Sequence, residues 1–161
     1  FQQVNMEIRI VDFYATNGYG LDHYAKVLRE KGYIYGKHYL PHDVDIRVLA
    51  GGDIAKTRKQ TLEGLGIPVT VVPKWSLEDG INAVRRVLPR VWFDPDTCEY
   101  LLKSLRQYRR HYDENRKVFM ERPLHDWASH AADAMRYLAI AVEDPTSGAN
   151  HFPQPDAKWV F

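Results

Sequence analysis

The chain has 161 residues, of which 45% are hydrophobic and 27% are charged, and this length and composition suit one domain with a real core. Its 22 Lys and Arg against 21 Asp and Glu leave a net charge of +1, which neither supports nor excludes a nucleic-acid partner. The single cysteine, Cys98, excludes an internal disulfide and favours a reducing compartment, and no apolar run of about 18 residues indicates a membrane span.

The N-terminal half of the chain predicts short strands that alternate with helices. Segment 6–14 is rich in β-branched and aromatic residues, and the turn residues of TNGYG follow it. Apolar residues recur at helical spacing over 21–31, and Gly32 ends that pattern. The predicted elements are a strand over 6–14, a helix over 21–31, a short strand ending at Pro41, an irregular segment over 46–54 with AGGD as a break, a helix over 57–65 closed by Gly66, and a strand over 67–73.

The C-terminal half continues the alternation. Ser76, followed three residues later by Asp79, resembles a capping box with Asp in place of the usual Glu or Gln. The predicted elements are a helix over 76–88, a crossing segment over 91–98, a long helix over 96–112, a strand over 117–123 and a helix over 124–142. After Pro145 the composition turns to Gly, Pro, Asn and Ser. We therefore predict an α/β domain over 1–145, followed by a loose tail over 146–161.

The predicted helix over 124–142 carries a run of ionisable residues. At 3.6 residues per turn, Asp126, His130, Asp133 and Tyr137 fall on one stripe. His130 and Asp133 can point at one spot, where an imidazole and a carboxylate bind a divalent metal ion. The same residues also allow a structural interpretation, in which Asp126 caps the helix start, His130 is half-buried and hydrogen-bonded, and Asp133 is solvated.

The motif YLPHDVD places Asp43 and Asp45 just after a predicted strand. Ligands of open α/β sheets gather at the carboxyl ends of strands, so an acid in this place suits a metal ion. The same letters also fit an ordinary turn. Asp12, in the first predicted strand, is a further candidate. Asp43 and Asp133 are far apart in the sequence, so their convergence depends on the fold.

A basic run surrounds the end of the predicted helix over 96–112. Its members are Arg106, Arg109, Arg110, Arg116 and Lys117. They are candidates for contacts with DNA phosphates, and a solvated helix face is the alternative. The segment GGDIAKTRK lacks the GxxxxGK[ST] spacing, which excludes an ATPase of the P-loop type from this stretch.

Four stretches of the sequence carry a family resemblance: YLPHD, LGIPVTVVPKWSLEDGINAVRRVLPRVWFD, LLKSLRQYRRHYDE and PLHDWASHAADAMRYLA. In order and spacing they resemble the C-terminal nuclease domain of the phage terminase large subunit, over about residues 6–142. The resemblance implies an RNase H-like fold, with a central mixed β-sheet flanked by helices. It also implies an endonuclease that holds two divalent cations, Mg²⁺ or Mn²⁺, and cuts concatemeric double-stranded viral DNA during packaging.

The resemblance assigns roles to three residues. Asp43 matches the second carboxylate of the family, Asp133 the third, and His130 a metal ligand or acid/base beside it. The first acid belongs to a strand that would lie before Phe1, so we expect an N-terminally truncated domain that lacks its first strand. The implied partners are double-stranded DNA, the terminase small subunit, the portal and the N-terminal ATPase domain of the same polypeptide, in the cytoplasm of the bacterial host and without a membrane.

Two other functions stay open at this point. The chain is alternatively a non-catalytic docking module of the packaging motor, for which we expect dispersed, solvated acids. It is alternatively a transposase or junction resolvase with the same RNase H-like fold, although the pattern SHAADAMRY argues against that class.

Overall fold

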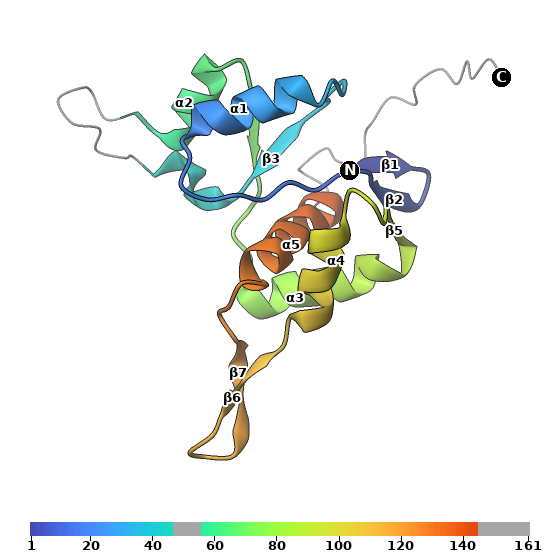
Figure 1. The fold of residues 1–161 in the computed structure, drawn as a ribbon, viewed down its shortest axis with the longest axis vertical. Helices are drawn as coiled ribbons and strands as arrows, with labels where there is room; N and C mark the ends of the chain where they lie inside the picture. Colours follow the sequence, from blue (N-terminus) through green and yellow to red (C-terminus); the bar gives the residue numbers. More distant parts are fainter. Residues whose placement is uncertain (47–55, 145–161) are drawn as a thin grey trace.

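The computed structural model describes residues 1–46 and 56–144. The predicted irregular segment over 46–54 falls almost entirely outside them, as does the tail over 146–161. Within the described part, the chain is mixed α/β, with five α-helices and several small sheets (Figure 1). In the same part, no helix is both long enough and apolar enough to cross a membrane.

The elements follow the chain in the order predicted, with three additional strands. The strands are β1 Gln2–Val4, β2 Glu7–Ile10, β3 His38–Leu40, β4 Val69–Val71, β5 Val91–Phe93, β6 Arg110–Asp113 and β7 Val118–Pro123. The α-helices are α1 Leu21–Glu30, α2 Arg58–Gly64, α3 Leu77–Val87, α4 Glu99–Gln107 and α5 Ser129–Glu143, and two 3-10 turns are η1 His42–Asp45 and η2 Leu88–Arg90. Strands β1, β5 and β6 were not predicted.

The described strands form three separate sheets, and the expected single central sheet is absent from this part of the chain. The first sheet is mixed, because β2 pairs antiparallel with β1 and parallel with β5. The second joins β3 and β4 in parallel, and the third joins β6 and β7 antiparallel. β1 and β3 are both edge strands, and the rings of Phe1 and Tyr39 stack with centroids 6.3 Å apart.

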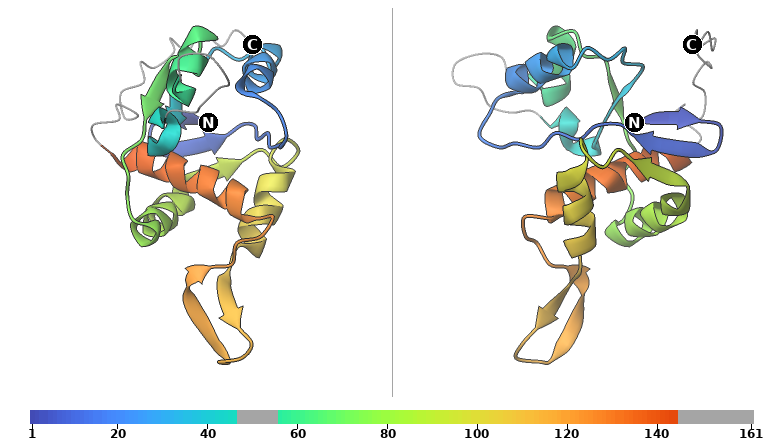
Figure 2. Two further views of the ribbon diagram at one scale, coloured as in Figure 1. Left: turned by 90° about the vertical axis from the view of Figure 1, so that its left-hand side faces the viewer. Right: turned by 45° about the vertical axis from the view of Figure 1, so that its right-hand side comes forward.

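Helix α5 connects the cores under the first two sheets. Its Ala131, Met135 and Ala139 pack with Ile8 and Ile10 of β2. Its Ile140 and Ala141 pack instead with Val72, which follows β4. The small side chains of the alanines in α5 let the neighbouring elements approach closely. As a result, nearly all of these alanines are buried. One helix therefore supports both sheets, as two turned views also show (Figure 2).

Local signals correctly predicted where several helices begin and end. The side chain of Ser76 accepts a hydrogen bond from the Asp79 N–H at 3.0 Å, so the predicted start of α3 is confirmed. Gly32 and Gly66, the predicted stops of α1 and α2, have φ values of +68° and +81°. Glycine adopts this left-handed conformation without steric cost, which suits a helix end.

Three predicted boundaries are wrong. The strand predicted over 6–14 ends at Ile10, the last residue of β2. The helix predicted over 96–112 ends at Gln107, because Arg110–Asp113 pairs with β7 as strand β6. The helix predicted from residue 124 begins at Ser129, because the Leu124 N–H donates to the Arg109 carbonyl at 2.9 Å and extends the β ladder. For both helices, pairing between the two strands of the β6–β7 hairpin replaces the local helical pattern.

Candidate functional site

A groove of about 500 Å³ lies between β3 and α5, and we call it the β3–α5 groove. Its lining is apolar and comes mainly from α1, β3 and α5, including Leu21, Leu28, Tyr39, Leu40, Ala134, Tyr137 and Leu138. Pro41, just after β3, borders the groove on one side, and Ala134 of α5 borders it on another. Two of the predicted site residues are close in sequence to these bordering residues: Asp43 follows Pro41 by two positions, and Asp133 immediately precedes Ala134.

Asp43 lies in η1, two residues after Pro41, at the carboxyl end of β3. Buried Val44 anchors this turn in the core formed with Ala25 and Leu62. The Asp43 side chain is 45% exposed and forms an ion pair with Arg58 of α2, at 3.8 Å from Oδ2 to Nη1. The prediction that an acid follows a strand end is confirmed. Asp45 is exposed at the end of the same turn.

Asp133 lies in the second turn of α5, one residue before Ala134. Its Oδ1 accepts hydrogen bonds from Nη2 and Nε of Arg136, at 2.9 and 3.2 Å. The Arg136 side chain is only 14% exposed, and its guanidinium also lies over the Tyr137 ring, 4.8 Å from its centroid. Burial raises the pKa of the nearby Tyr108 hydroxyl, and the negative charge of Asp133 adds to that rise. Asp133 is therefore not simply solvated.

His130 and Asp126 lie near the start of α5, in different environments. His130 is exposed, and its ring centroid is 5.7 Å from that of His125. Asp126 precedes the helix, so the predicted stripe that includes it is wrong. Its carboxylate accepts the Ala128 N–H at 2.9 Å, and its own N–H donates to the Ser129 hydroxyl at 2.9 Å. Asp126 therefore shapes the turn before α5 but does not cap the helix as the structural interpretation expected, because the N-cap is Ala128 and no side chain caps it.

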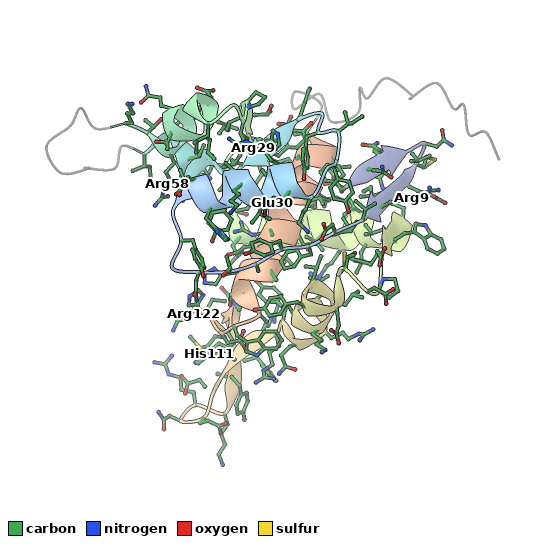
Figure 3. All side chains as sticks on the ribbon, turned by 45° about the horizontal axis from the view of Figure 1, so that its top comes forward. Arg9, Arg29, Glu30, Arg58, His111 and Arg122 are labelled. Carbon is green, nitrogen blue, oxygen red and sulfur yellow. The ribbon has the colours of Figure 1, made fainter. Side chains whose placement is uncertain are left out.

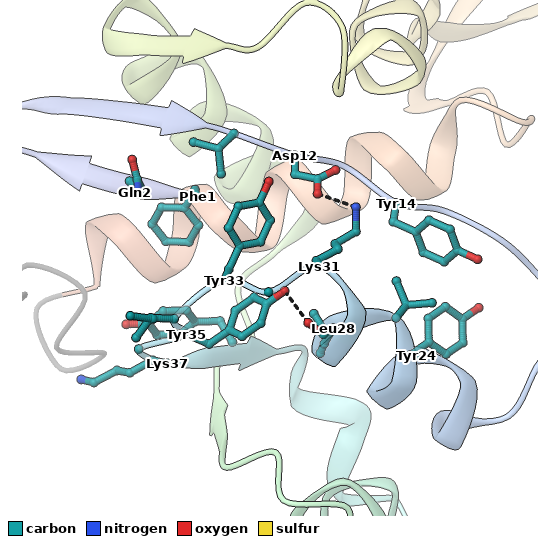
Figure 4. A pocket seen from close by; sticks show the side chains of 16 residues that line it. Phe1, Gln2, Asp12, Tyr14, Tyr24, Leu28, Lys31, Tyr33, Tyr35 and Lys37 are labelled. Atoms are coloured by element: carbon teal, nitrogen blue, oxygen red, sulfur yellow. Dashed lines mark hydrogen bonds and ion pairs between the residues drawn. The ribbon is translucent and has the colours of Figure 1, made fainter.

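Asp12 faces a second cavity, of about 680 Å³, which is lined by several tyrosines (Figure 4). It follows β2 by two residues, its side chain is 14% exposed, and it forms an ion pair and hydrogen bond with Lys31. Tyr35 donates a hydrogen bond to the Leu28 carbonyl at 3.0 Å on the same wall. Lys31 and the tyrosines were not among the predicted site residues, although GYIYG marks this aromatic segment in the sequence.

Three candidate carboxylates each have a basic partner: Asp12 with Lys31, Asp43 with Arg58 and Asp133 with Arg136. Among the described residues, no group of three His, Cys, Asp or Glu side chains is close enough to hold a metal ion. The donor types suit Mg²⁺ or Mn²⁺, because carboxylate oxygens are preferred ligands of hard cations. The described arrangement by itself does not form the expected centre with Asp43, His130 and Asp133 as common ligands.

Two buried polar atoms belong to residues shortly before Asp43 in the sequence. The Tyr39 hydroxyl and Nδ1 of His42 have no hydrogen-bond partner among the described residues. Burial also raises the pKa of the Tyr39 hydroxyl. Tyr39 lines the β3–α5 groove, and buried polar atoms in folded proteins are nearly always paired, so the Tyr39 hydroxyl suits an additional polar partner.

The predicted basic run is not on a helix face, apart from Arg106 in the last turn of α4. Arg109 is next to β6, Arg110 is its first residue, and Arg116 and Lys117 lie in the turn before β7. The helix-face alternative is therefore wrong for these four residues. They lie instead on a hairpin that projects from the rest of the protein (Figure 1).

Searches against protein-family models, curated proteins and solved structures found no match to this chain.

Proposed function

We propose that the chain is the nuclease domain of a viral DNA-packaging terminase large subunit, with an RNase H-like fold, acting in the cytoplasm of the bacterial host. The observation that supports this proposal best is the lining of the β3–α5 groove, which includes Pro41, two residues before Asp43, and Ala134, the residue after Asp133. The fold thus brings the segments that carry these acids, which are distant in sequence, to the same groove. His130 is one helical turn before Ala134, which lines it.

The residue types suit phosphodiester hydrolysis. Two divalent cations bound there would activate a water molecule and stabilise the leaving oxygen. In this proposal Asp43 and Asp133 supply carboxylate oxygens, and His130 supplies a ligand or an acid/base group. The cations must compete with Arg58 for Asp43, and this ion pair is about half exposed. Exposed ion pairs contribute only about 0–1 kcal/mol, so the competition costs little.

The test is plasmid cleavage in Mn²⁺ by the chain and by Asp133→Asn, with Asp96→Asn as a matched control on an exposed loop acid. Cleavage by the chain and the control, and its loss in Asp133→Asn, would support the nuclease. Mn²⁺ binding is measured in parallel by electron paramagnetic resonance. The proposal is refuted if the chain does not cleave and its Mn²⁺ binding is unaffected by both Asp43→Asn and Asp133→Asn.

The non-catalytic docking module is the second candidate. It is favoured by the ion pairs of Asp43 and Asp133, which leave the two acids separately neutralised in the described structure. This module would bind portal or motor proteins with the same affinity in EDTA and in Mn²⁺. Asp133→Asn would then leave that affinity unchanged, whereas metal-dependent cleavage by the chain would exclude a purely docking role.

A further inference from the structure

The hairpin formed by β6, its turn and β7 projects from the rest of the protein, and we call residues 109–123 the arm (Figures 1 and 2). Its strands pair with each other, and Tyr112 faces Phe119 across them with ring centroids 5.0 Å apart. The Asp113 carboxylate accepts the N–H groups of Asn115 and Arg116, both at 3.0 Å, which shapes the turn. An isolated two-stranded hairpin is marginally stable, so exposure of this one suggests a binding role.

The arm is more basic than the rest of the chain. Five exposed basic side chains lie along it: Arg109, Arg110, Arg116, Lys117 and Arg122. Its acids are Asp113, Glu114 and Glu121, so the arm carries a formal charge of +2 while the whole chain carries +1. The remaining residues together are therefore slightly acidic. Positive charge is concentrated on the part of the protein that projects farthest.

The root of the arm adjoins the candidate site. β7 ends at Pro123, and residues 124–128 lead directly into α5. His125 in this connection lies against His130 of α5, with ring centroids 5.7 Å apart. Arg122 and His111 lie near the root, close to the start of α5 (Figure 3). A long polyanion held by the arm would therefore extend past the N-terminal end of α5.

We propose that the arm is a β-ribbon that binds duplex DNA. The major groove, about 12 Å wide, admits a two-stranded ribbon, and basic side chains on such a ribbon reach the flanking phosphates. The exposed apolar side chain of Phe119, 64% exposed, would lie at the groove floor, where thymine methyl groups offer apolar contact. The inference rests on the proposed function for the identity of the substrate, duplex DNA, and it assigns the arm as the surface that binds this DNA.

The experiment measures fluorescence anisotropy of a short labelled duplex in EDTA over a NaCl series. The arm variant is Lys117→Gln with Arg122→Gln. The matched control, Arg9→Gln with Lys26→Gln, removes the same charge from β2 and α1, away from the arm; Arg9 is seen on the far side in Figure 3. Circular dichroism checks that both variants retain the parent fold.

The arm variant is expected to raise Kd roughly tenfold or more near 0.1 M salt, and to lower the slope of log Kd against log salt by about 1.8, because each lost phosphate contact removes about 0.9. The control variant is expected to keep the parent slope. Equal slopes in the arm and control variants would overturn the inference, as would a parent chain that binds no duplex. Retained DNA binding by the arm variant together with lost capture of a motor protein would assign the arm to a protein partner and overturn it too.

The outcome is separable from that of the cleavage test, since no metal-dependent cutting occurs in EDTA. Arm-dependent binding without cleavage in Mn²⁺ would reject the nuclease and keep the arm as a DNA-binding element. Cleavage with arm-independent binding would reject the arm and keep the nuclease.

Discussion

Gly80 of α3 lies against Arg136 and Ile140 of α5, and Gly80→Ala tests that packing. A Cβ atom added to Gly80 would lie 2.6 Å from both Cγ and Cδ of Arg136, and 3.5 Å from Cδ1 of Ile140. Carbon atoms attract each other best at about 3.5–4.0 Å, so the first two contacts are clashes. The clashing atoms belong to the middle of the Arg136 side chain, whose end is held by Asp133 and Tyr137.

Two opposing effects decide the free energy of unfolding of this variant. Replacing glycine by alanine inside a helix stabilises by about 0.5–1 kcal/mol. Overpacking a well-packed contact destabilises by about 1–3 kcal/mol. The Arg136 side chain is fixed to the backbone of α5 at one end, and its guanidinium is held by Asp133 and Tyr137 at the other. It therefore cannot move freely away from the new Cβ atom, and we expect the cost of overpacking to exceed the gain in helix propensity. We expect Gly80→Ala to lower the free energy of unfolding by about 0.5–2 kcal/mol, although helix propensity alone predicts stabilisation.

Urea unfolding followed by circular dichroism measures the change, with Gly64→Ala as the matched control. A Cβ at Gly64, the last residue of α2, meets no atom within 4 Å, so this variant should be neutral or more stable. The double variant Gly80→Ala with Arg136→Ala should show a favourable coupling, because the clash is removed. Stabilisation by Gly80→Ala equal to that of Gly64→Ala would refute the packing argument.

Three other changes have clear expected outcomes. Ser76→Ala removes the cap of α3 and should cost about 1 kcal/mol in urea unfolding, and an unchanged midpoint would contradict the cap's role. Met135→Ala, at a side chain 2% exposed, should cost about 2–5 kcal/mol, whereas Met135→Leu should cost less than about 1.5 kcal/mol; similar losses would argue against a cavity effect. Burial lowers the pKa of His38 in the folded protein from its ordinary 6.5. Below pH 6.5 the unfolded chain therefore binds more protons at His38 than the folded protein does. The free energy of unfolding should fall as the pH drops from 6.5 toward the lowered pKa. Unfolding free energies measured above and below pH 6.5 should show a weaker pH dependence in His38→Gln, and the same dependence in both would reject this cause.

The candidate site illustrates which interactions a sequence predicts. The ion pair of Asp133 with Arg136 joins residues three apart on one helix, so helical periodicity is sufficient to place them together. The ion pair of Asp43 with Arg58 joins a 3-10 turn to a different helix 15 positions later in the sequence, and no local pattern predicts it. The proposed roles of Asp43, His130 and Asp133 stay predictions until cleavage and metal binding are measured.

By itself the sequence determined the features that depend on neighbouring residues. Cap residues such as Ser76, stop glycines such as Gly32, and the amphipathic spacing of α1 specify local backbone structure, and all three are observed. Only the tertiary structure decided the division into three sheets, the end of α4 and the start of α5. The first two sheets depend on hydrogen bonds between strands that are distant along the chain, and the two helix ends depend on the pairing of β6 with β7. A strand edge carries no signal of which partner it meets, because the partner is selected by packing of the whole domain.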